Sequence, residues 1–150
     1  MVNPEEIKSV HLLTHLNEQM LRNVAELATI TTVKANEYIF KEGDYAENLY
    51  AVLEGKVALE VEKNSSSPVR VKDIVKERVF GISALVDTDD KLHMSHARAV
   101  TDSKIACWRA ADLEKLFHND AELGLIFMKR ITTVLKDRLQ IKNAQLASYA

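Results

Sequence analysis

The chain has 150 residues, of which 47% are hydrophobic and 28% are charged. Its length suits one domain, and its composition excludes a disordered chain, a collagen-like repeat and a disulfide scaffold. The formal net charge is -2, from 20 basic and 22 acidic side chains, so the basic excess typical of dedicated nucleic-acid-binding proteins is missing. We therefore expect no nucleic acid among the partners of this chain.

The N-terminal residues and the cysteine content bear on the cellular compartment. Cys107 is the one cysteine in the sequence, so no intramolecular disulfide can form, which favours a reducing, cytoplasmic location. The first residues lack the basic stretch and apolar run of a secretory signal. No window of about 18 apolar residues occurs, so the sequence predicts no membrane span.

The first elements in chain order have the pattern of helices and cover about residues 4–28. Asn3 and Glu6 have the spacing of a capping box, and Pro4 suits the first helical position. Asn17 is a candidate cap for a second short helix. Apolar residues that share one helical face follow at three- and four-residue spacing: Leu13, Leu16, Met20, Val24 and Leu27.

Short segments with strand character fill about residues 29–109. Residues 29–33 are β-branched, and residues 57–61 alternate in the way expected of a half-buried strand. Residues 64–68 have the composition of a hairpin loop. Further strands are expected at 37–40, 49–53, 69–71, 78–80, 97–100 and 104–108. Many short strands at near-regular spacing predict a sandwich or barrel.

Helical spacing returns over about residues 111–146, as a short helix followed by a long one that Asn119 or Asp120 can cap. The order of helices, strands and helices predicts an α+β class, with residues 1–150 forming a single domain.

The most distinctive motif is GDYAENLYAVLEGKV at residues 43–57. Gly43 and Asp44 suit a turn between strands, and Gly55 suits a hairpin turn that requires a positive φ. With Phe80 and Gly81 further along, this motif resembles the cyclic-nucleotide-binding domain family, of the catabolite-activator and protein kinase A regulatory-subunit type. The resemblance implies a β-jelly-roll, or double-stranded β-helix, flanked by N-terminal helices and a long C-terminal helix. It also implies a non-enzymatic regulatory role in signal transduction, with cAMP or cGMP as the possible ligand.

The resemblance further implies a ligand pocket at a phosphate-binding cassette. In the family, backbone N–H groups at the start of a short helix and one arginine bind the cyclic phosphate, and a glutamate accepts the ribose hydroxyl. The candidate pocket residues in this chain are Phe80, Gly81, Ile82, Ser83, Ala84, Leu85, Lys91, His93, Met94 and Ser95.

Two side chains depart from the family pattern. Ile82 stands where the family has the glutamate, and His93 falls at the arginine position. Losing both contacts would cost roughly 3–6 kcal/mol, or two to four orders of magnitude in affinity. A protonated His93 could replace part of the arginine's role, and Lys91 could swing into the pocket. Residues 87–90 add three carboxylates, which we expect to repel a phosphate.

Two functions follow as hypotheses. The first is a sensor domain that binds a cyclic nucleotide weakly or binds another ligand, and the second is a ligand-free structural or protein-interaction domain. Neither needs a cofactor or metal: His11 and His15 are four residues apart, but we interpret them as a solvated or interfacial pair.

The last helix allows two interpretations. Its apolar residues Leu123, Phe127, Ile131, Leu135 and Leu139 could pack on the chain's own sandwich. Alternatively, a homodimer could form through a four-three-four seam of Leu135, Leu139, Lys142 and Leu146, with the lysine as its flaw. No DNA-reading element fits between this helix and Ala150, so the sequence predicts either a stand-alone regulatory domain or a fragment of a longer protein.

Overall fold

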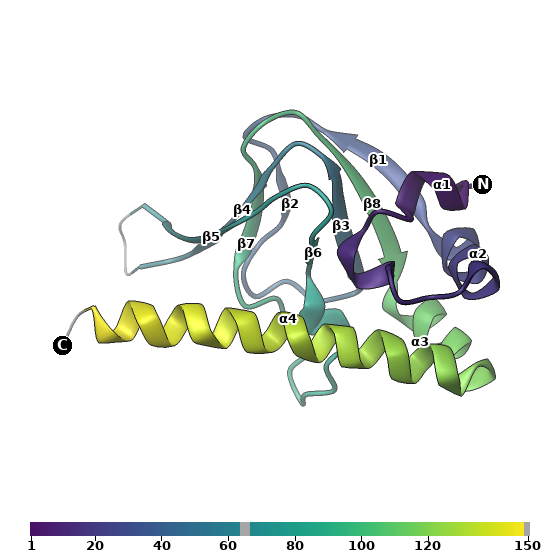
Figure 1. The fold of residues 1–150 in the computed structure, drawn as a ribbon. Helices are drawn as coiled ribbons and strands as arrows, with labels where there is room; N and C mark the ends of the chain where they lie inside the picture. The colour runs from purple at the N-terminus through teal and green to yellow at the C-terminus, as the bar shows by residue number, and fades with distance from the viewer. Residues whose placement is uncertain (64–66, 149–150) are drawn as a thin grey trace.

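The computed structural model describes residues 1–63 and 67–148. Two four-stranded antiparallel sheets form its centre, with the strand orders β1-β8-β3-β6 and β2-β7-β4-β5 (Figure 1). The strands are β1 (Thr29–Val33), β2 (Tyr38–Phe40), β3 (Asn48–Glu54), β4 (Val57–Val61), β5 (Val69–Ile74), β6 (Val79–Phe80), β7 (His96–Ala99) and β8 (Ser103–Arg109). This arrangement confirms the predicted α+β class and the jelly-roll between flanking helices.

Three short helices precede the strands: α1 (Pro4–Ile7), the 3-10 helix η1 (His11–Leu13) and α2 (Glu18–Leu27). The predicted capping box is present, because the Asn3 side chain accepts from the backbone N–H of Glu5 and the Glu6 carboxylate accepts from the backbone N–H of Asn3. Asn17 caps α2 by accepting from the backbone N–H of Met20 at 2.9 Å. Polar residues at the helix starts thus determine where the chain enters each helix.

Two hydrophobic clusters hold the elements together. The larger one lies between the sheet β1-β8-β3-β6 and the helices, and Trp108 anchors it by donating from Nε1 to the Val24 carbonyl at 3.0 Å. The smaller cluster lies between the two sheets and includes Phe40 and Phe80. It places the end of β6 against the inner face of the second sheet, and that position begins the candidate site.

Tight turns at glycine connect the strands around this centre. Gly55 has a φ of +92° and joins β3 to β4, as its position in the motif predicts. β4 and β5 form the predicted antiparallel hairpin, with Val57 opposite Ile74 and Val61 opposite Val69. Of the loop predicted at residues 64–68, residues 64–66 lie outside the described residues.

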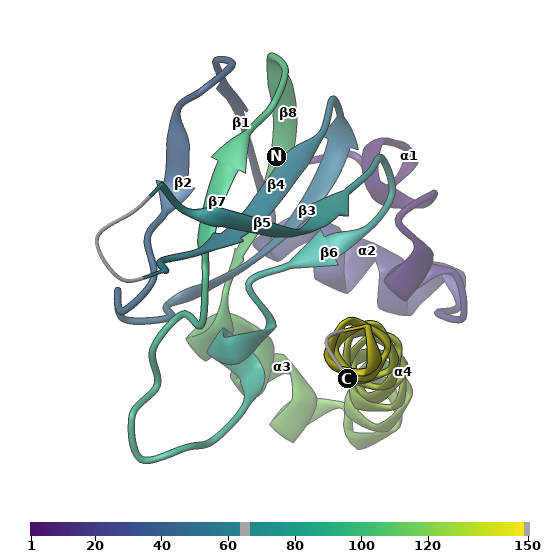
Figure 2. The same cartoon turned by 90° about the vertical axis from the view of Figure 1, so that its left-hand side faces the viewer.

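Two helices close the domain: α3 (Ala110–Asn119) and α4 (Ala121–Ala147). Asp120 caps α4 by accepting from the backbone N–H of Leu123 at 3.1 Å. The first half of α4 packs on the domain through buried Leu123, Phe127 and Ile131, whereas Leu139 is 60% exposed in the second half. Figure 2 looks along α4 and shows it running beneath β5 and β6. None of the helices described has both the length and the apolar character needed to cross a membrane.

Candidate functional site

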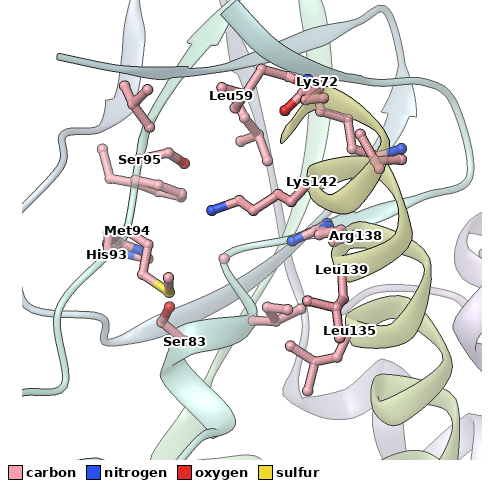
Figure 3. A pocket seen from close by; sticks show the side chains of 17 residues that line it. Leu59, Lys72, Ser83, His93, Met94, Ser95, Leu135, Arg138, Leu139 and Lys142 are labelled. Atoms are coloured by element: carbon pink, nitrogen blue, oxygen red, sulfur yellow. The ribbon is translucent and has the colours of Figure 1, made fainter. Parts of the chain in front are cut away.

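A cavity of about 260 Å3 lies between the segment that follows β6, the hairpin of β4 and β5, and the second half of α4 (Figure 3). Six of the ten residues predicted from the sequence line it, namely Gly81, Ile82, Ser83, His93, Met94 and Ser95. Eleven further residues complete its wall: Phe40, Leu59, Val61, Val71, Lys72, Leu135, Arg138, Leu139, Ile141, Lys142 and Gln145.

The other four predicted residues do not line the cavity. Phe80 is fully buried and stacks on Tyr50, with 5.1 Å between the ring centroids. Ala84 and Leu85 belong to the larger hydrophobic cluster. Lys91 does not turn toward the cavity, because its Nζ lies 3.7 Å from the carboxylate of Glu114 in α3. Burial and this ion pair therefore direct the four side chains elsewhere.

Gly81 determines how the chain enters the cavity wall. Its φ of +76° turns the backbone into the 3-10 helix η2 (Ile82–Leu85). A Cβ at this position would lie 2.9 Å from Cδ2 of Tyr50, so the close approach also requires glycine. The turn places Ile82, which is only 8% exposed, in the wall as an apolar surface with no hydrogen-bond acceptor on its side chain.

His93 contributes a neutral ring to the cavity. The imidazole stacks on Phe40 with 3.5 Å between the ring centroids and 5° between the ring planes. Burial lowers the pKa of His93 to about 4, although the nearby Asp44 carboxylate opposes the shift. Near neutral pH the ring is therefore uncharged, so it lacks the positive charge with which a protonated His93 could replace part of an arginine's role.

The acidic loop also differs from expectation. Asp87, Asp89 and Asp90 are exposed and do not line the cavity. Among the described residues of the cavity wall, none is Asp or Glu. The loop places these three carboxylates at the surface. A phosphate inside the cavity would therefore not face them across the wall, contrary to the predicted repulsion.

Positive charge enters the cavity from α4 and β5. Arg138 and Lys142 are one turn apart on α4 and point toward the side of the cavity formed by Met94 and Ser95 (Figure 3), while Lys72 comes from β5. Arg138 donates from Nη2 to the carbonyl of Val79 at 2.7 Å. The arrangement gives the cavity three basic side chains on an otherwise largely apolar wall.

The Arg138 guanidinium is only partly satisfied. Its Nε is buried and has no hydrogen-bond partner within the described part of the chain. Burial lowers the pKa of Arg138 to about 10, so the side chain keeps its charge at neutral pH. An unsatisfied buried donor costs about 1–3 kcal/mol, and more when it is charged. An anion in the cavity would stabilise the charge of this desolvated guanidinium.

A family model for the cyclic nucleotide-binding domain matches residues 30–120. The chain belongs to the cyclic nucleotide-binding domain family. The match runs from β1 to the end of α3 and so includes η2 and the loop with His93. It confirms the resemblance inferred from the motif at residues 43–57.

Curated relatives of this cyclic nucleotide-binding domain are distant. A global nitrogen regulator of Nostoc sp. is 24% identical over 114 residues, which cover 75% of this chain and 51% of the relative. A cGMP-dependent protein kinase, isozyme 1, of Drosophila melanogaster is 24% identical over 87 residues, which cover 57% of this chain and 11% of the kinase. The chain thus spans about half the length of the first relative and a small part of the second.

Solved structures share the fold. A cyclic nucleotide-binding domain from Methylobacillus flagellatus superimposes with a TM-score of 0.82 over 97% of this chain and 81% of that one, at 15% identity. At this identity the likeness concerns the fold alone, and it extends through α4.

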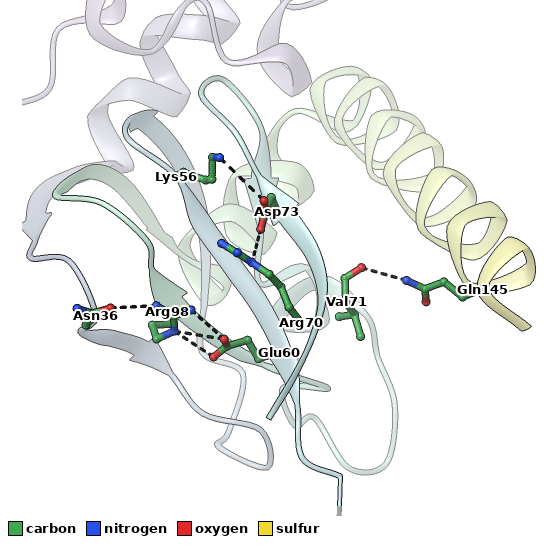
Figure 4. Close-up of polar contacts among 8 residues, drawn as sticks. All are labelled: Asn36, Lys56, Glu60, Arg70, Val71, Asp73, Arg98 and Gln145. Atoms are coloured by element: carbon green, nitrogen blue, oxygen red, sulfur yellow. Dashed lines mark hydrogen bonds and ion pairs between the residues drawn. The ribbon is translucent and has the colours of Figure 1, made fainter. Parts of the chain in front are cut away.

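Arg98 has a different role from a phosphate-binding arginine in this domain. Its Nη2 lies 3.0 Å from the Glu60 carboxylate, its Nη1 donates to Asn36, and it does not line the cavity (Figure 4). Glu60 is only 7% exposed, so the guanidinium balances a buried carboxylate. Arg98 is therefore committed to the structure of the second sheet.

Sequence reasoning missed Arg138 and Lys72 and assigned Lys142 only to a dimer seam. Arg138 and Lys142 belong to α4 and lie beyond the segment that the family model matches. A signal was nevertheless present, because Leu135, Arg138, Leu139 and Lys142 recur at three- and four-residue spacing and share one helical face. Such a face, with two cations beside leucines, is compatible with a helix that covers an anion-binding site. It is equally compatible with a dimer seam that is interrupted by a lysine.

The two histidines of the N-terminal segment are exposed, and His11 contacts the long C-terminal helix. His11 Nδ1 lies 3.0 Å from Nη2 of Arg130, so the contact joins η1 to α4. Within residues 1–63 and 67–148, no group of three or more His, Cys, Asp or Glu side chains is placed to hold a metal ion. The interpretation of His11 and His15 as a solvated or interfacial pair stays a prediction.

Proposed function

We propose that this domain is a non-enzymatic sensor that binds a small anion in the cavity and transmits its presence through α4. The observation that carries the proposal is the charge of the wall: Lys72, Arg138 and Lys142 line it, and none of its described residues is acidic. Converging cations at the edge of an apolar pocket favour anionic ligands.

Cyclic nucleotides are the first ligands to consider because of the family, and we expect them to bind weakly. Ile82 offers no acceptor for a ribose hydroxyl, and the neutral His93 offers no charge to the phosphate. The two missing contacts correspond to roughly 3–6 kcal/mol. Arg138 and Lys142 supply positive charge from another direction, so the anion would be held mainly by the helix.

Transmission through α4 follows from how its second half is attached. Two hydrogen bonds connect it to the sandwich: Arg138 Nη2 donates to the Val79 carbonyl, and Gln145 Nε2 donates to the Val71 carbonyl at 3.3 Å (Figure 4). A ligand that binds Arg138 in the cavity contacts the hairpin of β4 and β5 as well, while Arg138 itself is bonded to β6. It shifts the helix position if it binds one arrangement of α4 more tightly than another.

The test is isothermal titration calorimetry with the whole chain. The ligands are cAMP, cGMP, inorganic phosphate and simple organic acids at up to millimolar concentration. We expect at least one anion to bind with 1:1 stoichiometry, to raise the melting temperature, and to lose affinity in the Arg138→Gln variant. Lys136→Gln is the matched control, because Lys136 is an exposed cation of the same helix outside the cavity.

Absence of heat and of any thermal shift with every anion would overturn the proposal. It would favour the second candidate function, a ligand-free structural or protein-interaction domain. The apolar Ile82 and the neutral His93 in the cavity wall are the observations that support that alternative.

We also propose a homodimer through the exposed end of α4. Leu146 is 69% exposed and does not line the cavity, so its surface is free for contact with a second copy. Light scattering should show a dimer that the Leu146→Glu variant dissociates. A monomeric starting protein, or a folded variant that stays dimeric, would contradict this role of the helix.

A further inference from the structure

The cavity wall has two parts of opposite character. The cationic part is formed by Lys72, Arg138 and Lys142, and the two residues of α4 stand one helical turn apart. The apolar part comes from all three surrounding segments and includes Leu59 and Val71 of the hairpin, Ile82 and Met94, and Leu135 and Leu139 of α4. A ligand that fills the cavity must therefore present both a charged end and an apolar surface.

The uncharged polar side chains on the wall are Ser83, His93, Ser95 and Gln145, and Gln145 already donates to the Val71 carbonyl. Ile82 occupies the position next to Gly81, and the His93 ring lies flat on Phe40 rather than across the cavity. The hydroxyls on the wall belong to Ser83 and Ser95. Placing several sugar hydroxyls against apolar side chains without enough partners is unfavourable. The same surface favours a hydrocarbon or aromatic body.

Arg138 identifies where the charged end lies. Its Nη2 is already bonded to the Val79 carbonyl, and its buried charge has no acidic partner among the described residues. A guanidinium binds an oxyanion through two parallel N–H groups, which suits carboxylates and phosphates alike. Lys142 points to the same space, so an oxyanion there meets two cations (Figure 3).

The acidic groups near Arg138 belong to another surface. A second hollow shares Lys72 and Arg138 with the cavity, and it contains Asp73 and Asp137. Asp73 pairs with Arg70 at 2.7 Å. Neither carboxylate lines the cavity, so an anion inside it does not face them across the wall.

We propose that the ligand is an amphiphilic organic oxyanion, with a carboxylate or phosphate head at Arg138 and Lys142 and an apolar body against Ile82, Leu135 and Leu139. This inference rests on the proposed function, since it assumes that the cavity binds an anion. It goes beyond that function by assigning the ligand class and by placing the head on the helix instead of the cassette. The size of the cavity, about 260 Å3, suits a molecule somewhat smaller than most drug-sized ligands.

The experiment is a calorimetric comparison of matched probes, all below their micelle-forming concentrations. Decanoate and decyl phosphate carry head and body, decanol lacks the charge, acetate lacks the body, and cAMP represents the nucleotide class. We expect one of the two amphiphilic anions to bind 1:1 and at least about 10-fold more tightly than decanol, acetate or cAMP, because one charged hydrogen bond corresponds to about that factor. Whichever anion binds more tightly identifies the head group.

Variants of the cavity wall then show which residues bind the charged head of the ligand and which contact its apolar body. Arg138→Gln and Lys142→Gln should each weaken the amphiphilic anion by about 10-fold or more, while Lys136→Gln leaves its affinity unchanged. Ile82→Ser should weaken decanoate without changing the response to acetate. Lys142 is exposed, so its variant keeps the test valid even if Arg138→Gln proves unstable.

The outcomes separate this inference from the function on which it rests. If cAMP binds more tightly than both amphiphilic anions and Arg138→Gln weakens that binding, the ligand class is wrong and the anion sensor stands. If decanol binds as tightly as decanoate, the cavity does not recognise the charge, and both the ligand class and the anion sensor are overturned. If no anion binds at all, both are overturned.

Discussion

Arg138 in α4 donates a hydrogen bond from Nη2 to the backbone carbonyl of Val79, at 2.7 Å, next to the turn that forms the cavity wall. The long C-terminal helix is thus attached to β6 through the same side chain that presents positive charge to the cavity. The Arg138 guanidinium therefore contacts both β6 and the cavity. A ligand that binds to it in the cavity can change the position of the helix directly.

A first prediction concerns the cost of keeping Arg138 charged without a ligand. Its Nε is buried without a partner in the described structure, and burial lowers its pKa to about 10. An apolar side chain of similar length removes the cost of the buried charge and of the unsatisfied Nε, while it gives up the hydrogen bond to the Val79 carbonyl. We expect Arg138→Met to leave the free energy of unfolding unchanged, or to raise it by about 1–2 kcal/mol, while weakening anion binding by about 10-fold or more. Urea denaturation without ligand measures this, and a loss above about 1 kcal/mol would contradict it.

The ion pair of Arg98 and Glu60 allows a second prediction. Removing the arginine leaves a carboxylate that is only 7% exposed without its partner, so Arg98→Met should lower the free energy of unfolding by about 3–5 kcal/mol. The double variant Arg98→Met with Glu60→Leu should recover most of that loss, because neither charge remains. Ligand affinity in folded variants should not change, since neither residue lines the cavity. A double variant as unstable as the single one would show that the pair acts in another way.

Local signals made most of the fold predictable. The cap at Asn17 and the turn at Gly55 each depend on residues close together in the sequence, and the structure contains both. Their physical origin is short-range hydrogen bonding and backbone sterics. The strand predicted at residues 57–61 is present as β4, but its half-buried alternation is wrong, because Ala58 and Glu60 are buried along with Val57 and Leu59. The segment that begins at Phe80 and Gly81 was placed by the family resemblance, and the structure shows it as β6 followed by η2.

The electrostatics of the site could not be predicted in the same way. The pKa of His93 follows from burial against Phe40, which belongs to a distant strand. Arg138 and Lys142 become cavity residues only because α4 runs beneath β5 and β6 (Figure 2). Lys91 looked available, yet Glu114 of α3 lies beside it. In each case a contact between remote segments determines the charge or direction of a side chain.

The turn at Gly81 provides a third prediction, with Gly43 as the matched control. Both residues have a positive φ, so alanine at either position costs about 1–2 kcal/mol of backbone strain. A Cβ at Gly81 would lie 2.9 Å from Tyr50, whereas a Cβ at Gly43 would meet nothing within 4 Å. We therefore expect Gly81→Ala to cost about 1–3 kcal/mol more than Gly43→Ala in chemical denaturation. Equal losses would mean that Tyr50 moves aside freely.

His93 gives the last prediction, which concerns pH. Burial lowers its pKa in the folded protein to about 4, whereas an unfolded histidine has a pKa near 6.5. Between these values the unfolded chain binds a proton that the folded chain does not, so the free energy of unfolding decreases as the pH falls from about 7 to 4. The contribution of His93 reaches at most about 3 kcal/mol. NMR titration of the ring protons should give a pKa near 4, and the His93→Asn variant should lose this part of the pH dependence. Other titrating groups act in both proteins, so the difference between the two stability curves isolates His93, and parallel curves would show that the ring is protonated as readily when folded as when unfolded.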